Sequence, residues 1–137
     1  MALTVEDRLE ITELVARYNH AVDSGDGKAF ADTFTDDGAL DAAGRVIEGR
    51  AALASFAERL PKSVRAPRHI ASNLLVDGDS DACTATLAAY VQMYALDGEP
   101  PRQQVVASGL YDDRLTKVDG RWRFERRVFT ADRDAGS

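Results

Sequence analysis

Three side chains in the first half of the sequence have the types that proton-transfer chemistry requires. His69 is one of only two histidines, and an imidazole can take up a proton near neutral pH. Tyr18 could donate a hydrogen bond to a substrate carbonyl or enolate. Asp23 follows Tyr18 by five residues and could accept a ring N–H of a histidine. These residues predict a general-base site if the fold brings them together.

Each of these residues also has a purely structural interpretation. His69 could be a partly buried histidine whose ring bonds a backbone carbonyl. Tyr18 lies on the apolar stripe of a predicted helix, where its hydroxyl could be bonded internally. Asp23 precedes Ser24 and Gly25, and Asp-Ser-Gly is ordinary turn chemistry. The sequence leaves both interpretations open for all three residues.

Metal and phosphate chemistry find little support in the pattern. His20 lies two residues from Tyr18 and would point to the opposite side of a helix, so no histidine pair has metal-ligand spacing. Adjacent carboxylates such as Asp112 and Asp113 point to opposite faces of a strand. Cys83 is the only cysteine, which excludes an intrachain disulfide and a cysteine-based zinc site. The sequence therefore predicts no metal ion, and the proposed chemistry needs no organic cofactor.

Length and charge narrow the class of protein further. A chain of 137 residues favours one domain spanning 1–137. Its net charge of −6 does not provide the basic face that nucleic-acid binding needs. The N-terminus has no basic segment followed by an apolar stretch, and no apolar run approaches the roughly 20 residues of a membrane span. We expect a cytoplasmic protein that binds neither nucleic acid nor membrane.

The first sixty residues show helical periodicity. Thr4 and Asp7 resemble a capping box, and Gly25 can end the first helix in a left-handed conformation. Apolar residues recur between them at helical spacing. Further elements are predicted over residues 28–35 (a helix), 39–42 and 45–47 (a hairpin) and 50–60 (a helix closed by Pro61).

From His69 onward, apolar residues alternate with a period of two. Asp-Gly pairs separate the alternating runs, which is a strong hairpin signal because both residues tolerate positive φ. The two central strands are long and would coil under their own twist. Helices packed on one side of such a sheet give an α+β fold with a concave interior. The predicted strands are His69–Val76, Asp81–Leu96, Arg102–Val118 and Arg121–Phe129, with turns at Asp77-Gly78, Asp97-Gly98 and Asp119-Gly120.

Four segments together resemble SnoaL-like proteins of the nuclear transport factor 2-like superfamily. They are ITELVARYNHAVDSGDGKAFADTF (residues 11–34), EGRAAL (48–53), RHIASN (68–73) and DGRWRFERR (119–127). The resemblance covers nearly the whole chain. It implies a cone-shaped fold in which three N-terminal helices pack on a strongly curved antiparallel sheet. The superfamily holds dehydratases, dehydrochlorinases, isomerases, cyclases and plain binding domains, so the fold alone does not determine the activity.

The resemblance also implies a site and an activity. It places a catalytic His–Asp pair on His69 and Asp23, with Tyr18 as their partner. The implied activity is that of a cofactor-independent lyase, dehydratase-like, or an isomerase acting on a hydrophobic cyclic or aromatic small molecule. No histidine follows His69, which departs from the second pocket histidine of scytalone dehydratase. The alternative is a non-catalytic binding or accessory domain. The family further implies a homo-oligomer, either a dimer or a trimer.

The expected pocket draws on the same helices and strands. A closing-strand arginine lines the pocket in this family, and Arg127 or Arg126 would match it, because strand parity does not choose between them. Asn73 lies four residues beyond His69 and therefore on the same face of a regular strand. The remaining lining residues are expected to be Phe34, Phe56, Leu87, Met93 and Tyr111.

Overall fold

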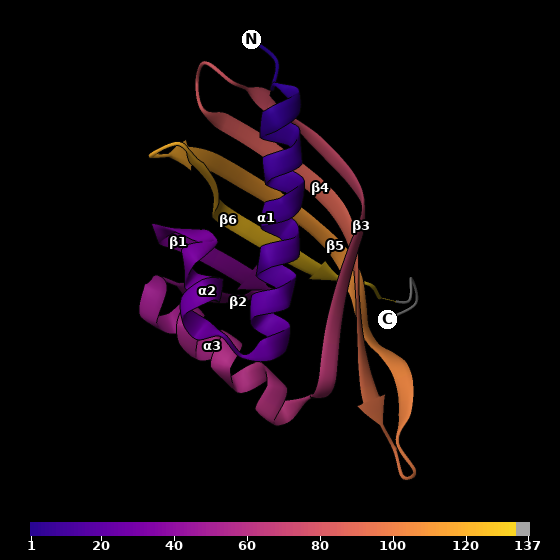
Figure 1. The fold of residues 1–137 in the computed structure, drawn as a ribbon. Helices are drawn as coiled ribbons and strands as arrows, with labels where there is room; N and C mark the ends of the chain where they lie inside the picture. Colours follow the sequence, from indigo (N-terminus) through magenta and orange to yellow (C-terminus); the bar gives the residue numbers. More distant parts are fainter. Residues whose placement is uncertain (134–137) are drawn as a thin grey trace.

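The computed structural model describes residues 1–133 and places three helices on one side of a curved sheet (Figure 1). Helix α1 crosses the concave side of the sheet, and α2 and α3 lie beside β1 and β2. This arrangement confirms the expected α+β cone. In chain order the elements are α1 (Val5–Ser24), α2 (Gly27–Asp32), β1 (Phe34–Ala42), β2 (Arg45–Glu48), α3 (Arg50–Ser63), β3 (Arg65–Asp79), β4 (Thr84–Asp97), β5 (Arg102–Val118) and β6 (Arg121–Ala131).

The six strands form one sheet in the order β2-β1-β6-β5-β4-β3. The last four strands make the expected antiparallel meander. Strand β1, however, runs parallel to β6, so the sheet is mixed rather than wholly antiparallel. The order also leaves β3, which carries His69, as an edge strand. One side of this histidine's backbone therefore has no strand to pair with.

Helix α1 begins and ends where the sequence indicates. Thr4 accepts a hydrogen bond from the Asp7 N–H at 3.0 Å, and Asp7 accepts one from the Thr4 N–H at 3.2 Å. Gly25 ends the helix with φ of 75°, a conformation that glycine adopts without strain. Asp7 also accepts hydrogen bonds from Trp122 Nε1 and Lys117 Nζ. These donors, Trp122 first, lower the pKa of Asp7 to about 2 and fasten the start of α1 to the sheet.

The next two helices differ from expectation at their ends. Helix α2 stops at Asp32 rather than Thr35, because Phe34 already pairs with Phe124 in the parallel ladder. Helix α3 continues through Pro61 to Ser63. Proline lacks only one N–H, and the next turn is closed by the Val64 N–H, which donates to the Leu60 carbonyl at 2.9 Å.

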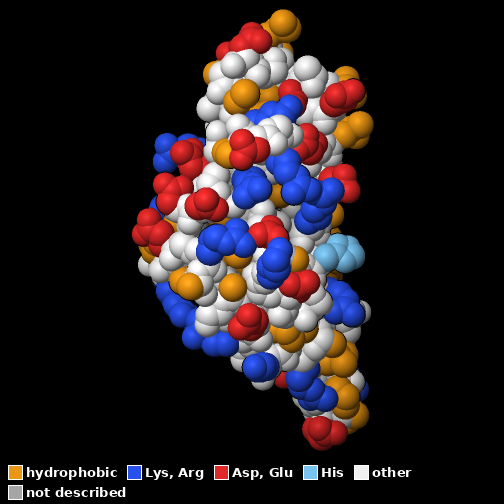
Figure 2. Space-filling view, turned by 60° about the vertical axis from the view of Figure 1, so that its left-hand side comes forward, with side chains coloured by type: hydrophobic (Ala, Val, Ile, Leu, Met, Phe, Trp, Pro, Cys, Tyr) orange, Lys and Arg blue, Asp and Glu red, His pale blue; other side chains and the backbone are white. Residues whose placement is uncertain are grey.

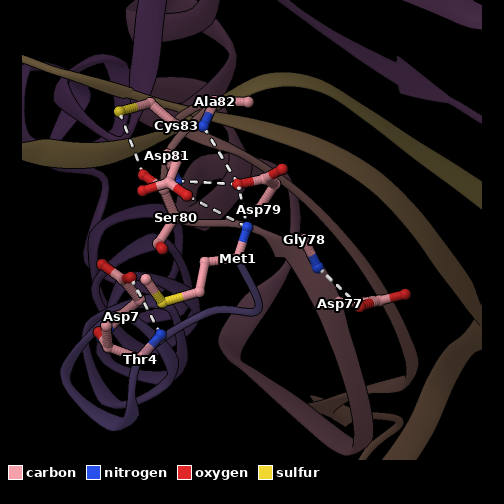
Figure 3. A network of polar contacts seen from close by, with 10 residues as sticks. All are labelled: Met1, Thr4, Asp7, Asp77, Gly78, Asp79, Ser80, Asp81, Ala82 and Cys83. Carbon is pink, nitrogen blue, oxygen red and sulfur yellow. Dashed lines mark hydrogen bonds and ion pairs between the residues drawn. The ribbon is translucent and has the colours of Figure 1, made fainter.

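The first Asp-Gly pair does not form the expected turn. Asp77 and Gly78 lie inside β3, and the chain reverses over residues 80–83. There the Asp79 carboxylate accepts hydrogen bonds from two backbone N–H groups and pairs with the Met1 ammonium at 3.1 Å (Figure 3). A Cβ at Gly78 would collide with the Thr84 carbonyl oxygen. The glycine therefore serves the close approach of two strands rather than a reversal of the chain.

The core lies between α1 and the concave face of the sheet. Tyr18 packs against Phe30, Phe34 and Phe124 with ring centroids 4.8 to 6.1 Å apart. Each fully buried side chain of this size contributes roughly 1.5–3 kcal/mol to stability. This aromatic cluster fixes α1, and with it both Tyr18 and the last helical turn.

The helical surface is charged and carries both signs. Lys and Arg side chains gather in the middle of the face in Figure 2, with Asp and Glu side chains around them. Arg17 pairs with Glu13 at 3.2 Å, and Asp32 pairs with Arg50 at 2.6 Å. Exposed pairs of this kind contribute at most about 1 kcal/mol each. Within residues 1–133, no helix has the length and apolar character that crossing a membrane would require.

Candidate functional site

Asp23 and His69 meet in a double contact. The Asp23 Oδ1 lies 2.6 Å from His69 Nδ1, and Oδ2 accepts a hydrogen bond from the His69 backbone N–H at 2.9 Å. The two side chains are 11% and 14% exposed, respectively. One carboxylate therefore holds both the ring and the backbone of the histidine, so the imidazole has little freedom to rotate.

Irregularities in both elements place this pair. Asp23 lies in the last turn of α1, which contains no basic residue, and a carboxylate there opposes the helix dipole. On β3, the pairing with β4 shifts register between Arg65 and Arg68, where Ala66 has φ of 47°. Such bulges redirect side chains next to functional sites. Asp23 thus lies at an unfavourable helix position and gains its compensation from the two N–H groups of His69.

The contact also determines which ring nitrogen can act as a base. An ionised carboxylate only accepts hydrogen bonds, so the nitrogen that faces Asp23, Nδ1, must carry the proton. In the neutral ring, Nε2 then keeps its lone pair. Among residues 1–133, no side chain makes a hydrogen bond to Nε2. The geometry therefore leaves Nε2 free to accept a proton from a bound molecule.

His69 borders an apolar cavity of about 160 Å³. Four other residues expected at the site line it as well: Tyr18, Phe56, Met93 and Tyr111. Sequence reasoning missed the rest of the lining, although Val91 and Met93 share the inward face of one alternating strand. The further lining residues are Leu40, Ala42, Leu60, Val91, Ala107 and Phe129.

Two buried phenols form part of the cavity wall. Burial raises the pKa of Tyr18 well above its usual value, and a hydrogen bond with Tyr111 raises it further. Burial likewise raises the pKa of Tyr111, and the positive charge of Arg127 opposes that shift. Both hydroxyls therefore stay protonated at neutral pH and can act as hydrogen-bond donors.

Arg127 lies behind these phenols and does not line the cavity. Its guanidinium carbon is 3.5 Å from the centroid of the Tyr111 ring and 4.4 Å from that of Tyr18. Its Nε donates to Asp113 Oδ1 at 3.1 Å, and both side chains are fully buried. Burial raises the pKa of Asp113 to about 6, which the charge of Arg127 only partly opposes. Sequence reasoning missed Asp113, although Tyr111, Asp113 and Leu115 alternate inward.

At two bulges the side chains of a strand change the side of the sheet to which they point. For this reason Arg126 and Asn73 do not lie where they were expected. Between β5 and β6 the register shifts after Arg114, so the inward side changes from Phe124 to Arg127. Arg126 consequently points outward and approaches Asp41 at 3.6 Å. A second bulge at Asn73, which has φ of 55°, removes that residue from the face of His69. Asn73 is exposed and borders a separate outer hollow.

Two apolar residues were also expected in the lining and lie elsewhere. Phe34 is completely buried in the aromatic cluster beneath the cavity. Leu87 is buried and borders an outer groove together with Arg126. Both positions face the concave side, but they lie farther along the sheet than the hollow extends. The alternation of apolar residues along a strand identifies the side that faces the core. It does not show where side chains fill that side and where a cavity remains.

A second space adjoins the Asp23–His69 pair. It is an open groove of about 1020 Å³ along α1 and β3, lined by both residues and by Asn19, His20, Arg68 and Gln103. His69 thus lies between a small apolar cavity and a larger groove whose wall mixes polar and apolar side chains. Over residues 1–133, three or more His, Cys, Asp or Glu side chains do not converge into a group that could hold a metal ion.

Comparisons with known proteins agree with the fold. The family model described as SnoaL-like domain matches residues 3–128. An uncharacterised protein of Mycobacterium tuberculosis is 29% identical over 130 residues, which cover 92% of this chain and 86% of that protein. A protein of unknown function from Mycobacterium tuberculosis has a solved structure with a TM-score of 0.87 and 35% identity, covering 94% of this chain and 73% of the other.

A third similar protein comes from Novosphingobium aromaticivorans and is described as nuclear transport factor 2-like with a cystatin-like fold. It is 25% identical with a TM-score of 0.86, covering 96% of this chain and 86% of the other. The family model spans both Asp23 and His69 as well as most of the closing strand. The chain therefore belongs to the SnoaL-like domain family.

Proposed function

We propose that this protein is a cofactor-independent lyase or isomerase in which His69 is the general base. The SnoaL-like family includes dehydratases and cyclases that act on small hydrophobic molecules. The observation that carries the proposal is the Asp23–His69 contact of 2.6 Å at the wall of an apolar cavity with two phenols. A fixed base, an apolar space and hydrogen-bond donors favour proton abstraction beside a carbonyl.

The proposed reaction begins when Nε2 of His69 takes a proton from a carbon next to a carbonyl or a leaving group. Asp23 stabilises the resulting imidazolium, as carboxylates do in other His–Asp pairs. Tyr111, which accepts a hydrogen bond from Tyr18, donates its own to the oxygen on which negative charge develops. In a dehydration, the C–H electron pair becomes the new double bond, and the hydroxyl leaves with the proton as water. In an isomerisation, His69 returns the proton to another carbon.

The size of the cavity limits the substrate. A cavity of about 150 Å³ in an apolar protein core binds one benzene molecule, and this one has about 160 Å³. Drug-sized ligands occupy roughly 300–1,000 Å³. We therefore propose that the reacting part of the substrate is a single ring, rather than the polycyclic molecule that the family resemblance allows.

The proposal is tested by hydrogen exchange into monocyclic ketones. Cyclohexanone and cyclohex-2-enone are incubated with the protein in deuterium oxide, and deuterium uptake beside the carbonyl is followed by NMR. We expect catalysed exchange that falls by about 100-fold or more in His69→Gln, since a positioned base contributes on the order of 100- to 10,000-fold. Arg59→Gln, on the exposed side of α3, is the matched control. Equal exchange in the wild type and His69→Gln would refute the role of His69.

A second candidate function is a binding domain without turnover. The Asp23 Oδ2 contact to the His69 backbone N–H favours it, because this bond joins α1 to an edge strand and has a structural use of its own. In that case, Asp23→Asn and His69→Gln lower the unfolding midpoint, and both wild type and variants fail to exchange hydrogen. Exchange that depends on His69 would dismiss the binding-only function.

We also propose that the chain forms a homo-oligomer through the outer face of its sheet. Tyr90 and Leu110 are direct neighbours across β4 and β5, and Leu75 projects nearby with 75% of its surface exposed. Contiguous exposed apolar side chains mark contact surfaces. Sedimentation should give a mass above that of one chain and a single-chain mass for Leu75→Glu. A monomeric wild type would contradict this assembly.

A further inference from the structure

The two spaces beside His69 differ in the share of polar groups in their walls, and the imidazole borders both. The cavity is lined mainly by aliphatic and aromatic side chains. The groove is lined by polar side chains of α1, β3, β4 and β5 together with apolar ones such as Ile70. His69 borders both spaces, whereas Asp23 borders only the groove. A ligand with one apolar and one polar part would fit this pair of spaces with its junction at His69.

Asn19 supplies an unsatisfied acceptor in the wall of the groove. Asn19 as a whole residue is buried, with 8% of its surface exposed, and its Oδ1 has no hydrogen-bond partner among the described residues. Buried polar atoms are nearly always paired. Asn19 precedes Asp23 by four residues and so lies on the same face of α1. This oxygen is itself enclosed, so a hydroxyl on a ligand in the groove would satisfy it after a turn of the Asn19 amide.

Arg68 supplies an uncompensated positive charge to the same groove. Its guanidinium donates to the Pro67 carbonyl at 2.8 Å, and no carboxylate among residues 1–133 lies within ion-pair distance of it. Asp23 is the only acid in the lining, and its two oxygens already contact His69. Arg68 is therefore the group in this groove that can pair with an anion.

We propose that the ligand of this site has two parts: a single ring in the cavity and a hydroxylated substituent ending in a carboxylate in the groove. The ligand hydroxyl donates a hydrogen bond to Asn19 Oδ1, and Arg68 forms an ion pair with the carboxylate. The bond between ring and substituent then lies beside His69. The inference rests on the proposed function for the identity of the site, but it concerns binding and does not require turnover.

The test uses one aromatic hydroxy acid and three probes, each of which lacks or masks one of its groups. These are 3-hydroxy-3-phenylpropanoate, its methyl ester, 3-phenylpropanoate and benzyl alcohol, with dissociation constants measured by NMR titration at low salt. The hydroxy acid should bind the wild type most tightly. Arg68→Gln should weaken the two acids about two- to five-fold and leave the ester unchanged. Asn19→Ala should weaken the hydroxy acid about five-fold and leave 3-phenylpropanoate unchanged. Arg59→Gln is the control and should affect none of the four.

Stability measurements separate a ligand-binding role of Asn19 from a structural one. If this oxygen is hydrogen-bonded only when a ligand is present, Asn19→Ala removes an unsatisfied group from the free protein. The unfolding midpoint of the free protein then stays unchanged or rises. A lowered midpoint would indicate a structural asparagine and overturn its part in the proposal. A wild type that binds the hydroxy acid no more tightly than benzyl alcohol would overturn the two-part ligand. These outcomes do not depend on the hydrogen-exchange assay, so either proposal can fail alone.

Discussion

Replacement of Arg127 by methionine should cause a loss of stability that grows with pH. Arg127 and Asp113 are fully buried and share one contact of 3.1 Å. Methionine keeps the apolar stem but removes the charge. Burial already raises the pKa of Asp113 to about 6, and Arg127 is the largest influence that lowers it. Without Arg127, the Asp113 carboxyl should remain in the core as the neutral acid.

The magnitude follows from the free energy needed to protonate this carboxyl. In the wild type Asp113 already has a pKa of about 6, so keeping this acid neutral in the variant costs about 1.4 kcal/mol for each pH unit above that value, relative to the intact pair. The pH-dependent loss is then at most about 2.7 kcal/mol at about pH 8 and close to zero at about pH 5. Loss of one partner from a buried ion pair usually costs about 3–5 kcal/mol in total. We expect the loss to be about 2–3 kcal/mol larger at the higher pH than at the lower pH.

The direction of this pH dependence is set by how many protons the folded and unfolded states bind. An acid whose pKa is raised on folding binds more protons in the folded state between its two pKa values, so the free energy of unfolding falls as pH rises through that window. Urea unfolding at both pH values measures the effect. Arg126→Met is the matched control, because Arg126 is the adjacent residue, is partly exposed and meets Asp41 only at 3.6 Å. Its loss should stay below about 1 kcal/mol. A loss for Arg127→Met that is the same at both pH values would refute the reasoning.

Three further predictions concern other parts of the fold. Asp7→Asn should flatten the decline in unfolding free energy between about pH 4 and pH 2, because the lowered pKa of Asp7 gives stability that is lost as the acid is protonated; acid titration of both proteins shows this, and parallel curves would contradict it. Gly78→Ala should cost about 1–3 kcal/mol, since the new Cβ meets the Thr84 carbonyl; an unchanged thermal midpoint would disprove the close contact. Ala107→Phe should fill the cavity and abolish benzene binding seen by NMR, whereas undiminished binding would place benzene elsewhere.

The sequence was informative where local chemistry and periodicity decide the outcome. Thr4 and Asp7 identified the start of α1, and Gly25 identified its end. The alternation after His69 predicted the meander. The family resemblance paired Asp23 with His69, which the contact of 2.6 Å now shows to be neighbours.

The differences arise where a single residue changes strand parity or where packing overrides a turn signal. One extra residue in β6 between Phe124 and Arg127 reverses which arginine faces inward, and nothing in the local sequence marks that insertion. The bulge at Asn73 acts in the same way on β3. At Gly78, the same absence of a side chain that permits a turn instead permits close strand packing. The extent of the cavity depends on all the surrounding side chains together, so the sequence could suggest a hollow but not its size.

The proposed function depends on an Nε2 of His69 that carries no proton and faces a molecule in the cavity. Nitrogen-15 NMR of the His69 ring at neutral pH, with and without phenol, shows which ring nitrogen carries the proton and whether Nε2 meets the ligand. We predict a proton on Nδ1, facing Asp23, and a shift of the Nε2 resonance as the phenol hydroxyl donates to it, with no such shift in Ala107→Phe. A proton on Nε2, or an Nε2 resonance that phenol leaves unchanged, would contradict the account.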